Sequence, residues 1–296
     1  MNGIVFFVSG QRGLRSLAAL CGRGHGVSCA VVPRLRGEDR TIRETCRDLA
    51  VDVVVADDVN DQSFIDILQS RRPQLFVIGG FPIIFKRPLL DVPVLGTINL
   101  HGGRLPEYRG GSPLNWQIIE GEPEIGISIV RTDEGIDNGD VLAETTFPLG
   151  INDDIQTVHA AANEEFPRLL VDVVEAMDRG DLVGRAQDET VARYWHQRNE
   201  EDGRIDWCKD GALRIHNLVR AITYPYPAAY CRWGDKRVRI FRAELASMTI
   251  CGVPGRVIWL QGRGPYVVCA DRAILLTEYS VEEVAAALLP NGVHLR

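Results

Sequence analysis

Short apolar runs and amphipathic stretches alternate along the first half of the chain. Continuous apolar runs predict buried strands at Ile4–Val8, Val27–Val32, Val51–Val55 and Leu75–Ile78. Between these runs, apolar positions recur at helical spacing, which predicts helices at Leu14–Cys21, Thr41–Leu49 and Ser63–Arg71. Such alternation is typical of a parallel sheet covered by helices on both faces, whose ligands bind at the carboxyl ends of the strands.

The pattern changes in the second half. A predicted strand at Gly96–Leu100 runs into a loop rich in glycine and polar residues, and a long amphipathic helix follows over residues 154–177. Short alternating runs between residues 229 and 277, separated by Gly, Pro and Asp, predict a small antiparallel barrel. The intervening polar stretch lacks periodicity and predicts a surface linker. The sequence therefore predicts three parts: an α/β domain in 1–180, a linker in 181–203 and a barrel domain in 204–296.

Composition narrows the class of protein. The 296 residues are 45% hydrophobic and 25% charged, which is typical of a globular protein. The chain has no apolar window of about 18 residues, so no membrane span is expected. Its seven cysteines are scattered without the spacing of metal ligands. They predict reduced thiols, a cytoplasmic location and no metal, while the oligomeric state is left open.

The formal net charge of −7 is unevenly distributed. Residues 1–203 hold 20 Lys and Arg against 32 Asp and Glu, a charge of −12, whereas residues 204–296 hold 13 against 8, a charge of +5. Because phosphate backbones attract basic proteins, this balance argues against DNA and against general nucleic-acid binding. It leaves a local contact to phosphates open.

Three polar residues between positions 96 and 140 could form one catalytic unit. Asn99 and His101 stand two apart at the end of a predicted strand, so their side chains project the same way. Asp137 lies in the glycine-bounded loop EGIDNGD, which permits close backbone approach. These three groups suit acyl transfer to an amine. The amide can stabilise a developing oxyanion, the imidazole can move protons, and the carboxylate can orient the imidazole. The alternative is that all three are ordinary loop and turn residues.

The same stretch resembles the folate-dependent formyltransferases, a family that includes enzymes acting on methionyl-tRNA, glycinamide ribonucleotide and nucleotide sugars. The resemblance rests on Asn99-Leu-His101, LPEYRG, PLNW and Gly135-Ile-Asp137-Asn-Gly-Asp140, and on EDGRIDW, IHNLVRAIT and PYPAAY in the second half. It implies a Rossmann-like, mostly parallel N-terminal domain and a small C-terminal OB-like β-barrel. It also implies that Asn99, His101 and Asp137 are the catalytic residues.

The resemblance further implies 10-formyltetrahydrofolate as the formyl donor and a primary amine as the acceptor. Direct transfer is expected, because the chain has no GxSxG or similar nucleophile motif. Two loops of the family bind the pterin. The matching residues are Phe81, Pro82, Ile83 and Ile84 in the first loop, and Asp133, Gly135 and Asp140 in the second. Without the resemblance, the run from Phe81 to Phe85 would be interpreted as core.

For the acceptor, the chain most resembles the nucleotide-sugar N-formyltransferases, such as the domain that formylates UDP-4-amino-4-deoxy-L-arabinose. Four residues are expected to contact it: Tyr108, Arg109, Gly110 and Trp116. Arg109 could equally brace its own loop. A tRNA acceptor is not expected, for two reasons. The tRNA enzymes of the family carry a long basic insertion after the second strand, whereas this chain has only Arg34, Arg36 and Arg40 there. The N-terminal part is also acidic. The alternatives are methionyl-tRNA formylation, formylation of a non-sugar amine or hydroxylamine, and a non-catalytic binding module.

Overall fold

The computed structural model describes residues 1–34, 40–260, 262–284 and 288–296. Its contacts divide the chain into two compact units. The first unit comprises Met1–Pro113, Gly126–Phe147 and Ala160–Trp195, and the second comprises Leu114–Ile125, Pro148–His159 and His196–Arg296. Within the described ranges, no helix has the length and apolar character needed to cross a membrane.

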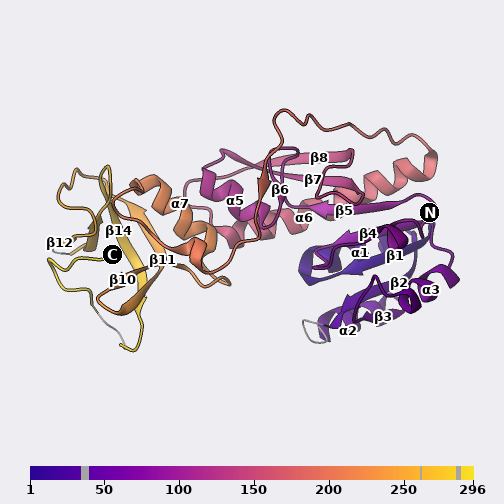
Figure 1. The fold of residues 1–296 in the computed structure, drawn as a ribbon, viewed down its shortest axis with the longest axis horizontal. Coiled ribbons are helices and arrows are strands. Elements are labelled where there is room, and N and C mark those ends of the chain that lie inside the picture. The colour runs from indigo at the N-terminus through magenta and orange to yellow at the C-terminus, as the bar shows by residue number, and fades with distance from the viewer. Residues whose placement is uncertain (35–39, 261, 285–287) are drawn as a thin grey trace. The chain divides into compact units, whose positions relative to one another are not determined.

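Seven strands of the described chain form the sheet of the first unit, in the order β3-β2-β1-β4-β5-β7-β8 (Figure 1). They are β1 (Asn2–Val8), β2 (Gly26–Pro33), β3 (Val53–Ala56), β4 (Leu75–Gly79), β5 (Thr97–His101), β7 (Glu124–Thr132) and β8 (Val141–Pro148). Strands β1 to β5 are mutually parallel, and β7 runs antiparallel to β5. The prediction of a mostly parallel α/β sheet is confirmed.

Helices cover both faces of this sheet because its strands are apolar on both sides. The helices are α1 (Gly10–Gly22), α2 (Arg40–Asp48), α3 (Gln62–Ser70), α4 (Arg87–Leu90) and the C-terminal part of α6 (Ile155–Arg179). On one face, Phe7 of β1 packs in a buried cluster with Phe64 and Leu68 of α3. On the other face, α1 lies so close to β4 that a Cβ on Gly13 would stand 2.4 Å from the carbonyl oxygen of Gly79.

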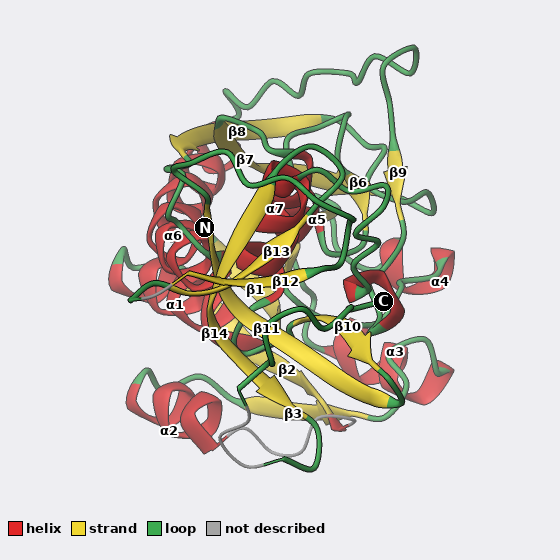
Figure 2. Cartoon of the chain, turned by 90° about the vertical axis from the view of Figure 1, so that its left-hand side faces the viewer, coloured by secondary structure: helices red, strands yellow, loops and turns green. Residues whose placement is uncertain are grey.

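The second unit contains an antiparallel sheet in the order β10-β11-β14-β13-β12. Its strands are β10 (Ala229–Trp233), β11 (Lys236–Leu245), β12 (Val257–Leu260), β13 (Gly264–Val268) and β14 (Ala273–Val281). Helix α7 (Ala212–Ile222) packs against β11 (Figures 1 and 2). Helix α5 (Pro113–Glu120), apart from its first residue, also belongs to this unit.

The expected OB-like barrel is not confirmed, because this sheet stays open. Closure would require the edge strands β10 and β12 to pair with each other, and the described residues give no such pairing. Irregular segments occupy the two edges instead. The amide of Ile205 donates to Tyr230 on β10, and Val257 on β12 exchanges backbone hydrogen bonds with residues 292–293. Alternating hydrophobicity predicts strands, but it does not specify which edges meet.

The segment predicted as a linker differs from the expectation over residues 181–195. Residues 181–195 belong to the first unit, where Arg185 pairs with Val141 of β8. Further along, β9 (Tyr194–Trp195) pairs in parallel with β6 (Arg109–Gly110). Two-residue strands and isolated bridges leave no periodic pattern in a sequence, so the polar composition alone suggested a solvated linker.

Candidate active site

The carboxyl ends of β1, β4 and β5 meet at one edge of the first sheet. Strand pairing places Ile78 of β4 beside Asn99 of β5, and the amide of Ser9 after β1 donates to Gly79 at 3.0 Å. At this edge the strand order reverses direction along the chain, between β1 and β4, and such a point is where open α/β sheets bind ligands. Strand β5 therefore delivers Asn99 and His101 to the position where a ligand site is expected.

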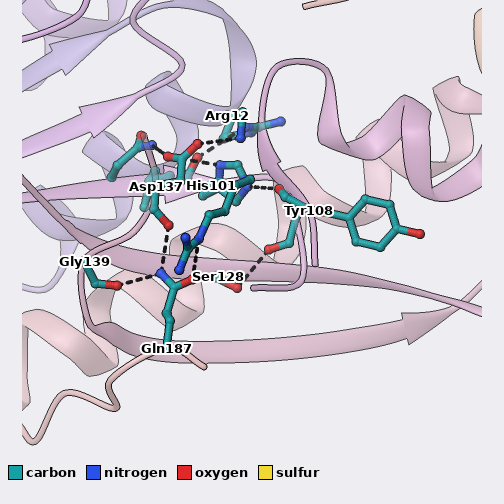
Figure 3. Close-up of polar contacts among 12 residues, drawn as sticks. Arg12, His101, Tyr108, Ser128, Asp137, Gly139 and Gln187 are labelled. Atoms are coloured by element: carbon teal, nitrogen blue, oxygen red, sulfur yellow. Dashed lines mark hydrogen bonds and ion pairs between the residues drawn. The ribbon is translucent and has the colours of Figure 1, made fainter. Parts of the chain in front are cut away.

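Three polar side chains converge here, as Figure 3 shows around Asp137. The Oδ1 atom of Asp137 lies 3.4 Å from Nδ1 of His101, and it accepts a hydrogen bond from Nδ2 of Asn99 at 3.3 Å. The other carboxylate oxygen, Oδ2, accepts from the amide of Gly110 at 3.0 Å. The structure thus brings together the three residues that the sequence singled out, two from a strand end and one from a loop.

Backbone contacts fix the orientation of the His101 ring, which is 4% exposed. Its Nε2 lies 2.6 Å from the carbonyl oxygen of Tyr108. Because a carbonyl only accepts, Nε2 carries the proton of this hydrogen bond. The loop closes this tightly because residue 103 is glycine: a Cβ there would lie 2.7 Å from Nε2 and 2.6 Å from the Tyr108 oxygen. Nδ1 is therefore the ring nitrogen that faces Asn99 and Asp137.

Asp137 occupies the hairpin between β7 and β8 in an unusual backbone conformation. Its φ is +51°, in the left-handed region, which costs a residue with a Cβ roughly 1–2 kcal/mol, although aspartate tolerates it better than most. Gly139 passes so close to β7 that a Cβ would lie 2.0 Å from the carbonyl oxygen of Arg131. In the same hairpin, the exposed Asp133 accepts from the amide of Gly135 at 2.8 Å, and Asp140 is exposed. Asp133 thus supports the turn.

Arg109 is enclosed within the first unit, so the expectation that it contacts the acceptor is corrected in favour of the bracing role. Its side chain is fully buried. The two Nη atoms donate to both carboxylate oxygens of Glu189, at 2.9 and 2.6 Å, and Nη1 also donates to the hydroxyl of Tyr194 at 2.7 Å. The hydrogen bonds that Arg109 donates to Glu189 raise the pKa of Arg109, and the same bonds lower the pKa of Glu189. The guanidinium has no free face for a substrate.

The other expected acceptor contacts have different surroundings. The ring of Tyr108 is buried and stacks on Trp195, with centroids 5.6 Å apart, so only its carbonyl reaches the site. Gly110 contributes its backbone amide to Asp137. Trp116 belongs to the second unit, where its indole donates to the carbonyl oxygen of His196 at 3.1 Å.

The loop between β4 and α4, expected to contact the pterin, divides into two parts. Phe81 and Phe85 are buried against Phe7, with ring centroids 5.5 and 4.6 Å away, as the core interpretation predicted. Pro82 is exposed, Ile83 is partly buried, and Ile84 is 74% exposed. Asn60, which no sequence motif singled out, holds the loop by donating to the carbonyl of Ile84 at 3.0 Å and accepting from the amide of Lys86 at 2.8 Å.

Gln187 is the other residue that sequence reasoning missed. Its Nε2 donates to the carbonyl oxygens of Asp137 and Gly139, at 2.8 and 2.7 Å, and its Oε1 accepts from Nε of Arg109 at 2.9 Å. It lies in the polar segment that was predicted to be a linker. One glutamine among many polar residues carries no local signal. Within the described part of the chain, no three His, Cys, Asp or Glu side chains are grouped to hold a metal ion.

Family models match most of the chain. The model described as "Formyl transferase" matches residues 28–174, and the one described as "Formyl transferase, C-terminal domain" matches residues 198–287. The chain belongs to the formyl transferase family. It is 33% identical to a methionyl-tRNA formyltransferase of Citrifermentans bemidjiense over 286 residues, which are 94% of this chain and 89% of that protein. Enzymes of this family are folate-dependent, so the protein is a folate-dependent formyltransferase.

Solved structures share the fold at low sequence identity. An N-formyltransferase from Helicobacter canadensis, in complex with folinic acid and dTDP-3-aminofucose, is 17% identical with a TM-score of 0.70, covering 93% of this chain and 99% of its own. HypX from Aquifex aeolicus in complex with tetrahydrofolic acid is 22% identical with a TM-score of 0.66, covering 95% of this chain and 44% of its own. A folate complex is thus known for a protein of this fold.

Proposed function

We propose that this formyl transferase moves the formyl group of 10-formyltetrahydrofolate onto the free amine of methionyl-tRNA. The observation that carries the proposal is the similarity to a methionyl-tRNA formyltransferase at 33% identity over 94% of the chain. The similarity extends over both units rather than over the first unit alone.

Two expectations from the sequence are corrected by this similarity: the nucleotide-sugar acceptor, and the exclusion of tRNA. The summed charge of −12 was a poor guide, because it adds up charges over 203 residues regardless of where they lie on the surface. A polyanion responds to the potential within about one Debye length, about 8 Å at physiological salt. Of the arginines after the second strand, Arg34 pairs with Asp57, Arg40 pairs with Glu44, and Arg36 lies outside the described residues.

The residues around the site fit a flat, partly apolar donor. Ile84, after β4, is 74% exposed, and Ile136, in the Asp137 hairpin, is 53% exposed. Exposed apolar side chains on two loops at a strand edge are suited to cover the faces of a ring system.

The three converging side chains support a direct transfer. When bound, 10-formyltetrahydrofolate supplies the formyl carbon that the amine attacks and the N10 atom that leaves and takes up a proton. Asn99 has one N–H directed at Asp137 and a second available for the formyl oxygen as it gains negative charge. The amine loses a proton to Nδ1 of His101, because Nε2 already donates to the Tyr108 carbonyl. His101 then passes this proton to the leaving nitrogen. Asp137 orients the ring and stabilises its protonated form.

The direct test is an acceptor comparison with purified protein and 10-formyltetrahydrofolate. Methionyl-tRNA, free methionine and a dTDP-linked amino sugar are supplied in turn, and the formylated product is identified by mass spectrometry after cleavage of the tRNA ester. We expect formylation of methionyl-tRNA, with kcat/KM falling as salt is raised, because phosphate contacts release counterions. Formylation of the amino sugar in place of methionyl-tRNA, or of none of the three, would contradict the proposal.

A further inference from the structure

The Asp137 hairpin needs an external restraint to keep its shape. Asp137 has a left-handed backbone conformation, and its neighbours Gly135 and Gly139 allow many others. Most of the hairpin is exposed: Ile136 is 53% exposed, and residues 133–136 and 138 contribute no buried side chain. Side-chain packing at residues 133–136 and 138 therefore contributes little to holding the carboxylate between Asn99 and His101.

Gln187 donates two hydrogen bonds to the backbone of the hairpin, at Asp137 and at Gly139. Its Nε2 donates at 2.8 Å to the carbonyl of Asp137 and at 2.7 Å to the carbonyl of Gly139 (Figure 3). The Asp137 carbonyl belongs to the peptide plane that directly follows the Asp137 side chain, and the Gly139 carbonyl lies two residues further along the hairpin. The orientation of the Gln187 amide is unambiguous, because carbonyls only accept and Nε of Arg109 only donates.

Arg109 fixes the position of Gln187 in turn. Its guanidinium is fully buried and is oriented by Glu189 and Tyr194, which lie on the same 187–194 segment as Gln187. The residues on either side of Arg109 contact the converging side chains: the Tyr108 carbonyl accepts from His101, and the Gly110 amide donates to Asp137. Residues 108–110 and the segment 187–194, which we call the strap, thus determine both ends of the His101–Asp137 contact.

We propose that Gln187 is a positioning residue for formyl transfer, which holds the Asp137 carboxylate against His101 through the hairpin backbone. This inference rests on the proposed function for its activity measurements. Gln187 does not contact the substrate in this account. Its effect reaches the reaction only through Asp137, and small displacements of an aligned group lower rates steeply.

Gln187→Met keeps the length and volume of the side chain and removes both donors. We expect kcat for methionyl-tRNA formylation to fall about 10- to 100-fold, while KM for donor and acceptor changes less than about twofold, because the substrate contacts are intact. Gln187→Glu retains the contact to Arg109 but directs an oxygen at two carbonyl oxygens, so its loss in kcat should be larger. The matched control is Thr190→Val on the same strap, because Thr190 is exposed and its amide and hydroxyl donate to Asp188, away from the hairpin.

Two further readouts separate positioning from a merely structural role. In an Asp137→Ala background, Gln187→Met should cause no additional loss in kcat, since its effect passes through Asp137. Hydrogen exchange of the peptide covering residues 133–140 should accelerate in Gln187→Met and stay unchanged in Thr190→Val, in protein without substrates. An unchanged kcat, a full additional loss in the Asp137→Ala background, or unaltered exchange would overturn the proposal. If wild-type protein does not formylate methionyl-tRNA, the proposed function fails, and the exchange measurement still decides the positioning role.

Discussion

Replacing His101 by alanine is expected to lower kcat for formyl transfer by roughly 10²- to 10⁴-fold, the usual contribution of a positioned acid–base group. The geometry gives the reason: Nδ1 of His101 faces Asn99 and Asp137, and it is the ring nitrogen that the Tyr108 carbonyl leaves free to accept a proton. The loss is measured by rapid-quench single-turnover assays with saturating donor and methionyl-tRNA.

A matched control for this variant is His25→Ala. His25 precedes β2 at the amino end of the sheet, opposite the edge where β5 ends, and its ring contacts the Met1 amine at 3.2 Å. We expect its turnover to equal that of the wild-type protein. Thermal unfolding of both variants checks that they are folded. Turnover in His101→Ala within about threefold of the His25→Ala value would remove His101 from the proton-transfer step.

Replacing Asn99 by alanine is expected to lower kcat by about 10²- to 10³-fold, as the loss of an oxyanion donor does in other acyl transfers. The variant removes the N–H that we propose donates to the formyl oxygen, and it also removes the bond that Nδ2 makes to Asp137 at 3.3 Å. KM for the donor should change little, because this interaction forms as charge develops in the transition state. Steady-state kinetics with varied 10-formyltetrahydrofolate measure both quantities.

Asn99→Asp sharpens this prediction. It preserves the shape of the side chain but has no donor when ionised, and it places a second carboxylate beside Asp137, where the two charges repel each other. We expect a loss in kcat at least as large as in Asn99→Ala. Full activity in Asn99→Asp at neutral pH would show that residue 99 donates no hydrogen bond to the oxyanion.

The sheet of the first unit and the meeting of its polar side chains followed from simple periodicities. Apolar runs of strand length predicted β1 to β4. Strands β1, β2 and β4 are largely buried on both faces, and β3, at the edge of the sheet, is partly buried. Asn99 and His101 were expected to project together because side chains on a strand alternate, and glycines beside Asp137 indicated a loop able to approach them. Their side chains lie together as predicted, and their catalytic roles stay predictions.

Other parts of the site had no readable pattern. Gln187 and Glu189 act through contacts to residues about 50 and 80 positions away, and neither spacing nor composition indicates such pairs. Arg109 was expected at the acceptor because guanidinium groups bind phosphates, but its complete burial depends on a strap that contains only one two-residue strand. The sequence also could not show that the second sheet stays open, since strand periodicity is the same in open and closed sheets.

The identity of the acceptor illustrates a similar limit. Motifs of the reacting centre are shared by enzymes that formylate different amines, so the Asn99, His101 and Asp137 positions carried no information about the acceptor. The resemblance around residues 108–116, the missing basic insertion after the second strand and the acidic charge of the N-terminal part then served as the arguments about the acceptor, and they pointed the wrong way. Similarity over both units to a methionyl-tRNA formyltransferase corrected it.

The central claim is that Asn99, His101 and Asp137 act as one unit in formyl transfer. The most direct test compares the three single alanine variants with the triple variant, using single-turnover rates on methionyl-tRNA. Groups that act together show strongly non-additive losses, so we predict that the triple variant is no more than a few-fold slower than the slowest single variant. Losses that multiply across the three positions would contradict the account, because they would mean that each side chain contributes independently.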